Sequence, residues 1–338
     1  MNALPWLAEP LARAIAQQRA HATLVHGPAG VGQFHFALSL ASAWLCEAGE
    51  GRPCGRCASC RLMAAQVHPD FSLLVPEALR EPLGWPLPDT ESAAERKDKK
   101  PSREIRVEAV RAAIDWGQRT STRGGAKVAL LHPADAINPV AANALLKTLE
   151  EPPGALRLIL SAADPASLLP TVRSRCQHIT LSTPPDDVAL AWLQAQGVQG
   201  ADTLLMAAGG QPLLAQAFAA DGLSADLWHE LPRLVRQGQA GPLLALPLPR
   251  LIDALQRLCH DLSLHAQGAP ARFFDQPLPA GADPVALADW ASELRRAARH
   301  DGHPWNAGLL AEALLLAGRK AWQIAASGPR RSPTLAAR

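Results

Sequence analysis

The sequence has little net charge, no apolar run long enough to cross a membrane, and no secretory pattern near its first residue. Its 338 residues carry a formal charge of only +2, so the total charge gives no reason to expect binding to nucleic acid or to a membrane surface. Glu9, Arg13 and Arg19 interrupt the first twenty residues, which argues against a secretory signal. No stretch approaches the ~20 apolar residues of a membrane span. We therefore expect a cytoplasmic protein.

Short apolar runs alternate with helical periodicity in the first part of the chain. With 48% apolar and 19% charged residues, the chain is long enough for two or three domains with hydrophobic cores. The patterns predict strands at 22–26, 127–131 and 156–161, and helices at 5–19, 34–45, 105–118 and 138–150. Alternation of this kind predicts a parallel sheet with helices on both faces, a doubly wound α/β core.

Strand patterns fade after about residue 184, and helical patterns replace them. Helices are expected at 187–196, 201–208, 212–218, 251–265, 285–300 and 304–322. Residues 76–103 are rich in Pro, Glu, Lys and Asp, and this composition predicts a solvated insertion or loop. These features divide the chain into a core at 1–182, a small helical region at 183–223, longer helices at 224–326 and a flexible tail at 327–338.

The glycines of the first strand-to-helix connection have the spacing of a P-loop. Gly27, Gly30 and Gly32 match a scaffold whose backbone N–H groups hold phosphates at the start of a helix. The next two positions should be Lys and Ser or Thr, but they are Gln33 and Phe34. The cation that meets the β- and γ-phosphates and the hydroxyl that holds Mg²⁺ are therefore missing. We expect a loop of P-loop origin that binds ATP poorly; a plain turn is the alternative.

The acidic pair of a catalytic P-loop protein is missing as well. Such a pair belongs at the end of a later buried strand, where it binds Mg²⁺ and orients water. The strand at 127–131 ends in His132 and Pro133, and neither residue can do this. Asp135 lies further on, where a turn or N-cap residue is the simpler interpretation. After the next strand, Ser161 offers one hydroxyl. These replacements argue against an ATPase.

Four of the six cysteines lie in one fifteen-residue window, at Cys46, Cys54, Cys57 and Cys60. Without an export signal, such clustering indicates metal binding rather than disulfides. Four thiolates suit a closed, tetrahedral, structural Zn²⁺ site, and an iron–sulfur cluster is the alternative. His68 is a possible substitute ligand, although a loop residue is the simpler interpretation.

Two further segments point to a family. Residues 143–153 (NALLKTLEEPP) and 173–176 (RSRC) resemble the clamp-loader subunits of bacterial DNA polymerase III, a branch of the AAA+ proteins. The resemblance spans nearly the whole chain, and the family has a similar zinc module. It implies an AAA+ RecA-like core with a degenerate P-loop, a helical lid at 183–223, and a helical collar at 224–326 that holds the subunits in a ring.

The resemblance also separates branches of that family. Gamma or tau subunits keep the P-loop Lys, its Ser or Thr and the acidic pair, whereas the delta-prime branch has lost them. The replacements in this chain favour the delta-prime branch, and Pro212 stands where an active subunit has a nucleotide-sensing Arg. This branch implies no intrinsic ATPase and a place in the DNA polymerase holoenzyme. Its implied partners are the gamma or tau and delta subunits, with the beta sliding clamp and primed DNA reached through the assembled complex.

The same resemblance assigns an arginine finger to Arg175. It implies that Arg175 reaches the γ-phosphate of ATP held by a neighbouring gamma-type subunit, so ATP is bound by the partners. A planar, permanently charged guanidinium suits this role because it can bind phosphate oxygens bidentately. For a lone arginine, a surface salt bridge would be the simpler interpretation. Cys176, beside it, is expected to be a small packing residue.

Three basic residues near the second predicted strand leave a further alternative open. Arg119, Arg123 and Lys127 are expected to be solvated, with contact to a DNA backbone as the alternative.

For the whole protein, two other functions compete with the resemblance. A true ATPase of gamma or tau type would need Lys at position 33 and a carboxylate near position 132. A zinc-stabilised scaffold without a role in replication would need neither.

Overall fold

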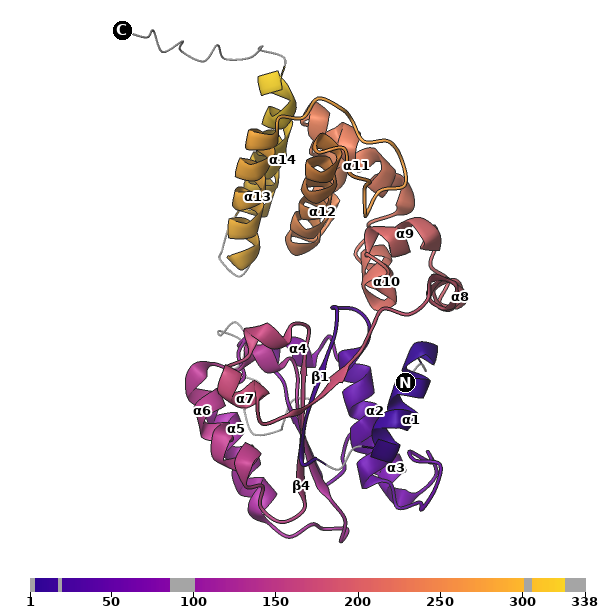
Figure 1. Ribbon diagram of the computed structural model, residues 1–338, viewed down its shortest axis with the longest axis vertical. Coiled ribbons are helices and arrows are strands. Elements are labelled where there is room, and N and C mark those ends of the chain that lie inside the picture. The colour runs from indigo at the N-terminus through magenta and orange to yellow at the C-terminus, as the bar shows by residue number, and fades with distance from the viewer. Residues whose placement is uncertain (1–3, 18–19, 86–100, 301–305, 326–338) are drawn as a thin grey trace, which may run out of the picture. The chain divides into compact units, whose positions relative to one another are not determined.

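The computed structural model describes residues 4–17, 20–85, 101–300 and 306–325. The chain divides into two compact units, Met1–Thr183 and Pro184–Arg338. The first combines strands with helices, and the described elements of the second are all helical (Figure 1). No helix within the described ranges is long and apolar enough to cross a bilayer.

The first unit contains a five-stranded sheet. Its strands are β1 (Ala22–His26), β2 (Phe71–Leu74), β3 (Lys127–Leu131), β4 (Leu156–Ala162) and β5 (Gln177–Thr180). Its α-helices are α1 (Ala8–Gln17), α2 (Gln33–Leu45), α3 (Ala58–Ala64), α4 (Glu77–Arg80), α5 (Val107–Gln118), α6 (Pro139–Glu150) and α7 (Pro170–Arg173). Short 3-10 turns occur at η1 (Pro5–Leu7), η2 (Ala134–Ala136) and η3 (Pro165–Ser167).

The sheet is parallel throughout, with the strand order β2-β3-β4-β1-β5. Strand β1 lies between β4 and β5, two strands that come much later in the chain, so Val25 lies opposite both Ser161 of β4 and Ile179 of β5. The parallel sheet was predicted, and so were β1, β3 and β4. The edge strands β2 and β5 were not predicted, because each has only four residues and most of them are not fully buried.

Helices cover both faces of this sheet. Helix α2 packs on β1, β3 and β4 from one side, with α1 against it, and α5 and α6 lie on the opposite side (Figure 1). On that side Val110, Leu145 and Leu149 share a core with Leu158 and Leu160 of β4. The prediction of a doubly wound α/β core is confirmed.

Helix boundaries follow local capping chemistry. The Oδ1 atom of Asn138 accepts a hydrogen bond from the backbone N–H of Ala141 at 2.9 Å, and Pro139 takes the first helical position of α6. The predicted helix at 5–19 contains η1 and then α1, with residues 18–19 outside the described ranges. Within the predicted insertion, α4 forms a short turn of helix, and residues 86–100 lie outside the described ranges, as does the predicted tail at 327–338.

The described elements of the second unit are helical, as the sequence predicts. They are α8 (Asp186–Ala195), α9 (Ala201–Ala207), α10 (Pro212–Ala220), α11 (Ala225–Gln237), η4 (Gly241–Ala245), α12 (Leu248–Ala266), α13 (Pro284–Arg299) and α14 (Ala307–Ala325). Each helix predicted there overlaps one of these elements, and the ends differ by a few residues. The first residues of the helix predicted at 304–322 lie outside the described ranges.

Two fully buried residues of the second unit, Trp228 and Asp261, connect its helices to the segment that follows α12. The fully buried ring of Trp228 stacks on Phe274 with centroids 4.5 Å apart, and its Nε1 donates to the carbonyl oxygen of Phe273 at 3.1 Å. The Oδ2 atom of Asp261, also fully buried, accepts backbone N–H bonds from Arg272, Phe273 and Phe274 at 2.9, 2.6 and 3.1 Å. These bonds fasten the segment after α12 to that helix.

Candidate functional site

The glycine-rich loop joins the carboxyl end of β1 to the start of α2. Gly30 and Gly32 have φ angles of 85° and 102°, a conformation that glycine adopts without strain. At Gly27 an added Cβ atom would lie 2.2 Å from the carbonyl oxygen of Leu181, so the close approach of these two chain segments also requires glycine. Strand, turn and helix follow in the predicted order. Phosphate binding by these glycines stays a prediction.

The residue in the place of the P-loop lysine turns back onto the loop. The Nε2 atom of Gln33 donates hydrogen bonds to the carbonyl oxygens of Gly27 and Pro28, the second at 2.7 Å. The side chain is buried, and its amide offers no positive charge to a phosphate. Phe34, in the place of the Mg²⁺-binding hydroxyl, packs its ring 4.8 Å from that of His132. Both positions are therefore used for contacts within the protein.

The end of β3 carries an imidazole where a catalytic relative needs a carboxylate. The Nδ1 atom of His132 lies 2.8 Å from the hydroxyl oxygen of Ser161, which joins the two predicted polar positions of neighbouring strands. Burial, and to a smaller extent the nearby His35, lower the pKa of His132 to about 4. The ring is therefore neutral at neutral pH. Asp135 lies in the turn η2, as predicted.

Arg175 lies in the connection between α7 and β5. Its Nε atom donates to the Oε1 atom of Glu150 at 2.7 Å, and its Nη2 atom donates to the same oxygen. Its Nη1 atom donates to the carbonyl oxygen of Thr171 at 2.9 Å. The side chain is 34% exposed. The salt bridge considered as the alternative interpretation is thus present, but it uses only part of the guanidinium, which has five N–H donors.

The cysteine beside Arg175 has the packing role that the sequence predicts. Cys176 is buried, and its Sγ atom donates to the carbonyl oxygen of Val172 at 3.4 Å. Burial raises the pKa of this thiol to about 12. It is therefore an un-ionised side chain that anchors the backbone next to Arg175.

The four clustered cysteines converge on one point. Cys46 ends α2, Cys57 caps the start of α3, Cys60 lies within α3, and Cys54 lies in the loop before it. All four Sγ atoms lie within 4.8 Å of one another, with Cys46 and Cys57 separated by 3.9 Å and Cys54 and Cys60 by 4.0 Å. Four metal–sulfur bonds of ~2.3 Å in a tetrahedron place the sulfurs about 3.8 Å apart. The cluster can therefore bind a tetrahedral metal ion.

Backbone N–H groups surround these sulfurs. The N–H groups of Cys54, Cys57 and Cys60 point to the Sγ atoms of Cys46, Cys54 and Cys57 at 3.4, 3.3 and 3.4 Å, respectively. Hydrogen bonds from the backbone of Arg56 and then of Cys57 lower the pKa of Cys54 to about 6, because they stabilise the thiolate. Burial raises the pKa of Cys60 to about 12, and a metal cation bound at the cluster would favour ionisation of that thiol.

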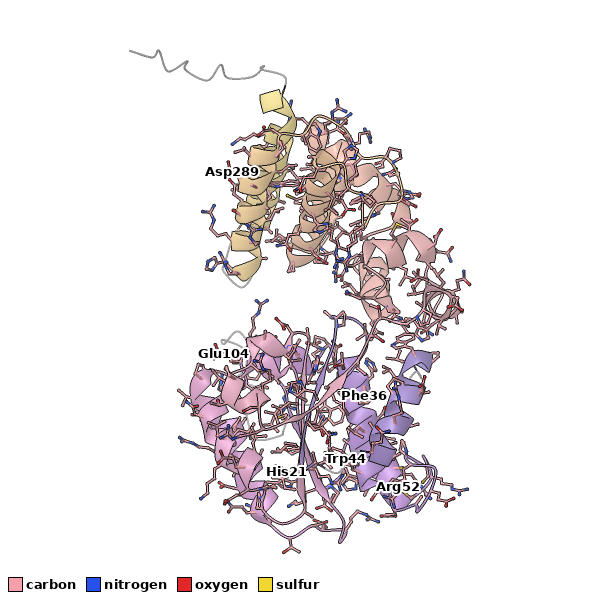
Figure 2. The ribbon with its side chains drawn as sticks, in the orientation of Figure 1. His21, Phe36, Trp44, Arg52, Glu104 and Asp289 are labelled. Carbon is pink, nitrogen blue, oxygen red and sulfur yellow. The ribbon has the colours of Figure 1, made fainter. Side chains whose placement is uncertain are left out.

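A polar network ties this module to the sheet. The Nε atom of Arg123 donates to Glu47 at 2.8 Å and to the hydroxyl oxygen of Ser59 at 3.1 Å, and each acceptor is next in sequence to a cysteine of the cluster. Ser59 also lies 3.0 Å from the Nε2 atom of His68. Asp70 accepts the backbone N–H of Arg123 at 2.9 Å. His68 is therefore a buried loop residue outside the cysteine cluster, in agreement with the simpler interpretation. Trp44 near the end of α2 and Arg52 in the following loop mark this end of the unit in Figure 2.

Comparison with known proteins assigns the chain to a family. A family model described as DNA polymerase III, delta subunit, matches residues 5–185. The DNA polymerase III subunit delta' of Pseudomonas aeruginosa is 35% identical over 324 residues, which cover 88% of this chain and 92% of the relative. The chain belongs to the delta' subunit family of the DNA polymerase III clamp loader. The delta' subunit of Escherichia coli is 32% identical over 281 residues, covering 76% of this chain and 77% of that protein.

Membership in the delta' family confirms both the resemblance to clamp-loader subunits and the choice of branch made from the P-loop replacements. The DNA polymerase III subunit tau of Salmonella typhimurium is 33% identical over 162 residues, 48% of this chain and 21% of that protein, so the family is related to tau. The chain accordingly has an AAA+-like α/β domain followed by a helical region.

One expectation about charge was wrong. Lys127 was expected to be solvated, but it is 4% exposed, and its Nζ atom donates to the carbonyl oxygens of Trp116 and Arg119 at 2.7 and 3.1 Å. The ammonium also lies 4.4 Å from the centre of the Trp116 ring. Arg123 is paired with Glu47. Lys127 is the first residue of the buried strand β3, and its contacts with the end of α5 could not be foreseen from its place at the start of a strand.

Proposed function

We propose that this delta' family member does not hydrolyse ATP itself and contributes Arg175 to the ATP site of a neighbouring gamma or tau subunit. The observation that carries the proposal is the contrast between two side chains. The side-chain amide of Gln33, at the lysine position of the P-loop, is hydrogen-bonded to carbonyl oxygens of its own loop. Arg175 keeps its guanidinium one-third exposed, with only three of its donors in hydrogen bonds.

The lack of intrinsic ATPase follows from the replaced groups. A bound triphosphate needs a cation at its β- and γ-phosphates and oxygen ligands for Mg²⁺. Gln33 supplies no charge, Phe34 supplies no oxygen, and His132 is a neutral imidazole held against Ser161. A nucleotide at Gly27, Gly30 and Gly32 would meet backbone N–H groups alone, and these do not provide the missing catalytic charges.

The contribution of Arg175 is electrostatic. Negative charge spreads over the γ-phosphate oxygens in the transition state, and an arginine supplied from another subunit can accelerate such hydrolysis by about 10³- to 10⁵-fold. In this role the chain is a rigid partner. Gamma or tau and delta subunits are its proposed neighbours, and the assembled complex places the beta sliding clamp on primed DNA during replication.

We also propose that the metal of the cysteine cluster is Zn²⁺. Four thiolates in a closed tetrahedral set are the usual donors of structural zinc, and the Sγ separations of 3.9 and 4.0 Å fit them. Bound zinc would neutralise the negative charge of the thiolates and link the end of α2 to the start of α3. It would have no open position for a substrate. Cys46, Cys54, Cys57 and Cys60 would hold it, and Glu47 and Ser59 would connect it to Arg123.

The helical unit divides in the same proposal into a lid at 183–223 and a collar at 224–326. The lid would contain α8, α9 and α10, and the collar α11 to α14. Pro212 opens α10 at its first turn and is buried, so it provides backbone geometry and apolar packing where an active subunit has an arginine. A lid without that arginine fits a subunit that does not respond to nucleotide.

Reconstitution tests the proposed finger. The full chain carrying Arg175→Ala is assembled with gamma or tau and delta subunits, and the ATPase rate is measured with clamp and primed DNA. We expect the complex to assemble normally and hydrolysis at the ATP site served by Arg175 to fall by about 10³-fold or more. Arg111→Ala, which removes an exposed arginine of α5, is the charge-matched control. An unchanged rate with Arg175→Ala would refute the finger, and hydrolysis by the isolated wild-type chain would support the alternative of an active ATPase.

A further inference from the structure

Glu150 is the main partner of the Arg175 guanidinium. It is the last residue of α6, and one of its oxygens accepts from both Nε and Nη2 of Arg175, the first at 2.7 Å. The carbonyl oxygen of Thr171 accepts from Nη1 at 2.9 Å. These contacts use three of the five N–H donors of an arginine, so two are left for another ligand. Two donors are the number that a bidentate contact with a phosphate needs.

Both ends of the contact are fixed by the fold. Leu145 and Leu149 bury the inner face of α6 in the sheet core, which places the carboxylate at the end of an anchored helix. Helix α7 packs on α6, and it carries the carbonyl oxygen of Thr171. On the other side of Arg175, the buried Cys176 is hydrogen-bonded to Val172. The guanidinium is therefore hydrogen-bonded to two acceptors, on Glu150 and Thr171, that lie on packed helices.

We propose that Glu150 is a positioning residue that holds Arg175 in the orientation in which its remaining donors meet a phosphate of the neighbouring subunit's ATP. The proposal rests on the proposed finger role of Arg175. A flexible arginine loses rotamer freedom when it binds, and a contact that restricts it beforehand lowers that cost. A carboxylate that orients a neighbouring catalytic group in this way is familiar from the aspartate of the Ser-His-Asp triad.

The exposure of the Arg175–Glu150 pair favours a carboxylate that orients the guanidinium over one that keeps it away from a phosphate. The side chains of Arg175 and Glu150 are 34% and 49% exposed, and ion pairs in contact with solvent are weak. The carboxylate therefore competes poorly with a multiply charged phosphate, while its geometry still directs the guanidinium. If the pair instead acted as a latch that kept Arg175 away from phosphate, loss of the carboxylate would speed hydrolysis.

The test uses the full chain in complexes reconstituted with gamma or tau and delta subunits. Glu150→Gln keeps the size of the side chain and removes the charge. We expect kcat for ATP hydrolysis to fall by about tenfold, with KM for ATP unchanged because the nucleotide is bound elsewhere. Glu150→Asp, which keeps a carboxylate on a shorter stem, should lie between Glu150→Gln and wild type. Glu151→Gln is the matched control, since this exposed neighbour should leave the rate unchanged.

A double variant separates positioning from a structural effect. In the Arg175→Ala background, Glu150→Gln should cause no further loss, because there is no guanidinium left to orient. A loss that persists in that background, or a rise in kcat with Glu150→Gln alone, would overturn the proposal. If Arg175→Ala lowers the rate and Glu150→Gln does not, the positioning role fails while the finger role stands. If Arg175→Ala itself has no effect, both fail.

Discussion

The side-chain amide of Gln33 is hydrogen-bonded to the carbonyl oxygen of Pro28 at 2.7 Å, across the turn that forms the phosphate cradle of active relatives. A second bond runs to the carbonyl oxygen of Gly27. The glycine-rich loop therefore lacks the usual lysine, and Gln33, in the place of that lysine, is hydrogen-bonded to the backbone of the loop itself.

Restoring the lysine alone should not restore turnover. We expect Gln33→Lys to give at most weak ATP binding and no hydrolysis, because the hydroxyl and the carboxylates for Mg²⁺ are still replaced by Phe34, His132 and Pro133. Titration with a fluorescent ATP analogue and a phosphate-release assay check this on the isolated chain. Gln33→Leu, which adds no charge, is the control. Measurable phosphate release by Gln33→Lys would show that the other losses do not prevent catalysis.

His132 should make the first unit less stable at mildly acidic pH. Its native pKa is about 4, below the unperturbed value of about 6.5, so the unfolded chain binds a proton that the native chain does not. The resulting stability is present above about pH 6.5 and is lost as the pH falls toward 4. Relative to wild type, His132→Gln should lose less stability between pH 7 and pH 5, by about 2 kcal/mol.

Denaturant unfolding at pH 7 and pH 5 measures that difference. His265→Gln, which changes an exposed histidine of α12, serves as the control and should follow the wild type. Identical pH dependence in wild type and His132→Gln would mean that the imidazole takes up a proton freely in the native state.

Metal removal should destabilise the first unit. Purified protein should contain one zinc ion per chain, and Cys54→Ser should lose it and lower Tm by about 5 to 10 °C, since metal binding and folding are coupled. Elemental analysis and a thermal melt are the measurements. Cys176→Ala, which changes a cysteine outside the cluster, should keep the metal. A coloured, iron-containing preparation would replace zinc with an iron–sulfur cluster.

Loss of the buried carboxylate in the helical unit should be costly. Asp261→Ala leaves the N–H groups of Arg272, Phe273 and Phe274 without their acceptor, and we expect destabilisation of about 3 to 5 kcal/mol. Asp261→Asn retains one acceptor oxygen and should cost less. Denaturant unfolding followed by tryptophan fluorescence reports on the adjacent Trp228. Asp289→Ala is the control, because Asp289 is an exposed residue of α13 (Figure 2).

The sequence predicts those parts of the fold that depend on neighbouring residues. Strands β1, β3 and β4 are apolar runs that are almost wholly buried, so composition and length identify them. Strand β5 contains Gln177 and His178, which are exposed at the edge of the sheet, and its pairing with β1 is not visible in its composition. Strand β2 cannot be recognised from its composition either, because three of its four residues are only partly buried.

The candidate sites divide in the same way. The cysteine cluster and the P-loop replacements lie within short segments and can be predicted from spacing. The partners that orient these groups are distant in the chain: Glu150 is 25 residues from Arg175, and Glu47 is 76 residues from Arg123. An acidic residue in a run such as 143–153 gives no local signal of its partner, so only the folded chain identifies these pairs.

The strand order has a consequence for synthesis on the ribosome. Strand β1 pairs only with β4 and β5, and Thr23 lies opposite Ile159 and Gln177. At an elongation rate of about 5 to 20 residues per second, β1 has no neighbouring strand for about 7 to 27 seconds after it is made, until β4 is complete. The four cysteines emerge together within fifteen residues. They are available to a metal ion before β1 has either neighbour, so the first long-lived order in the nascent chain can be the metal-bound segment rather than the sheet.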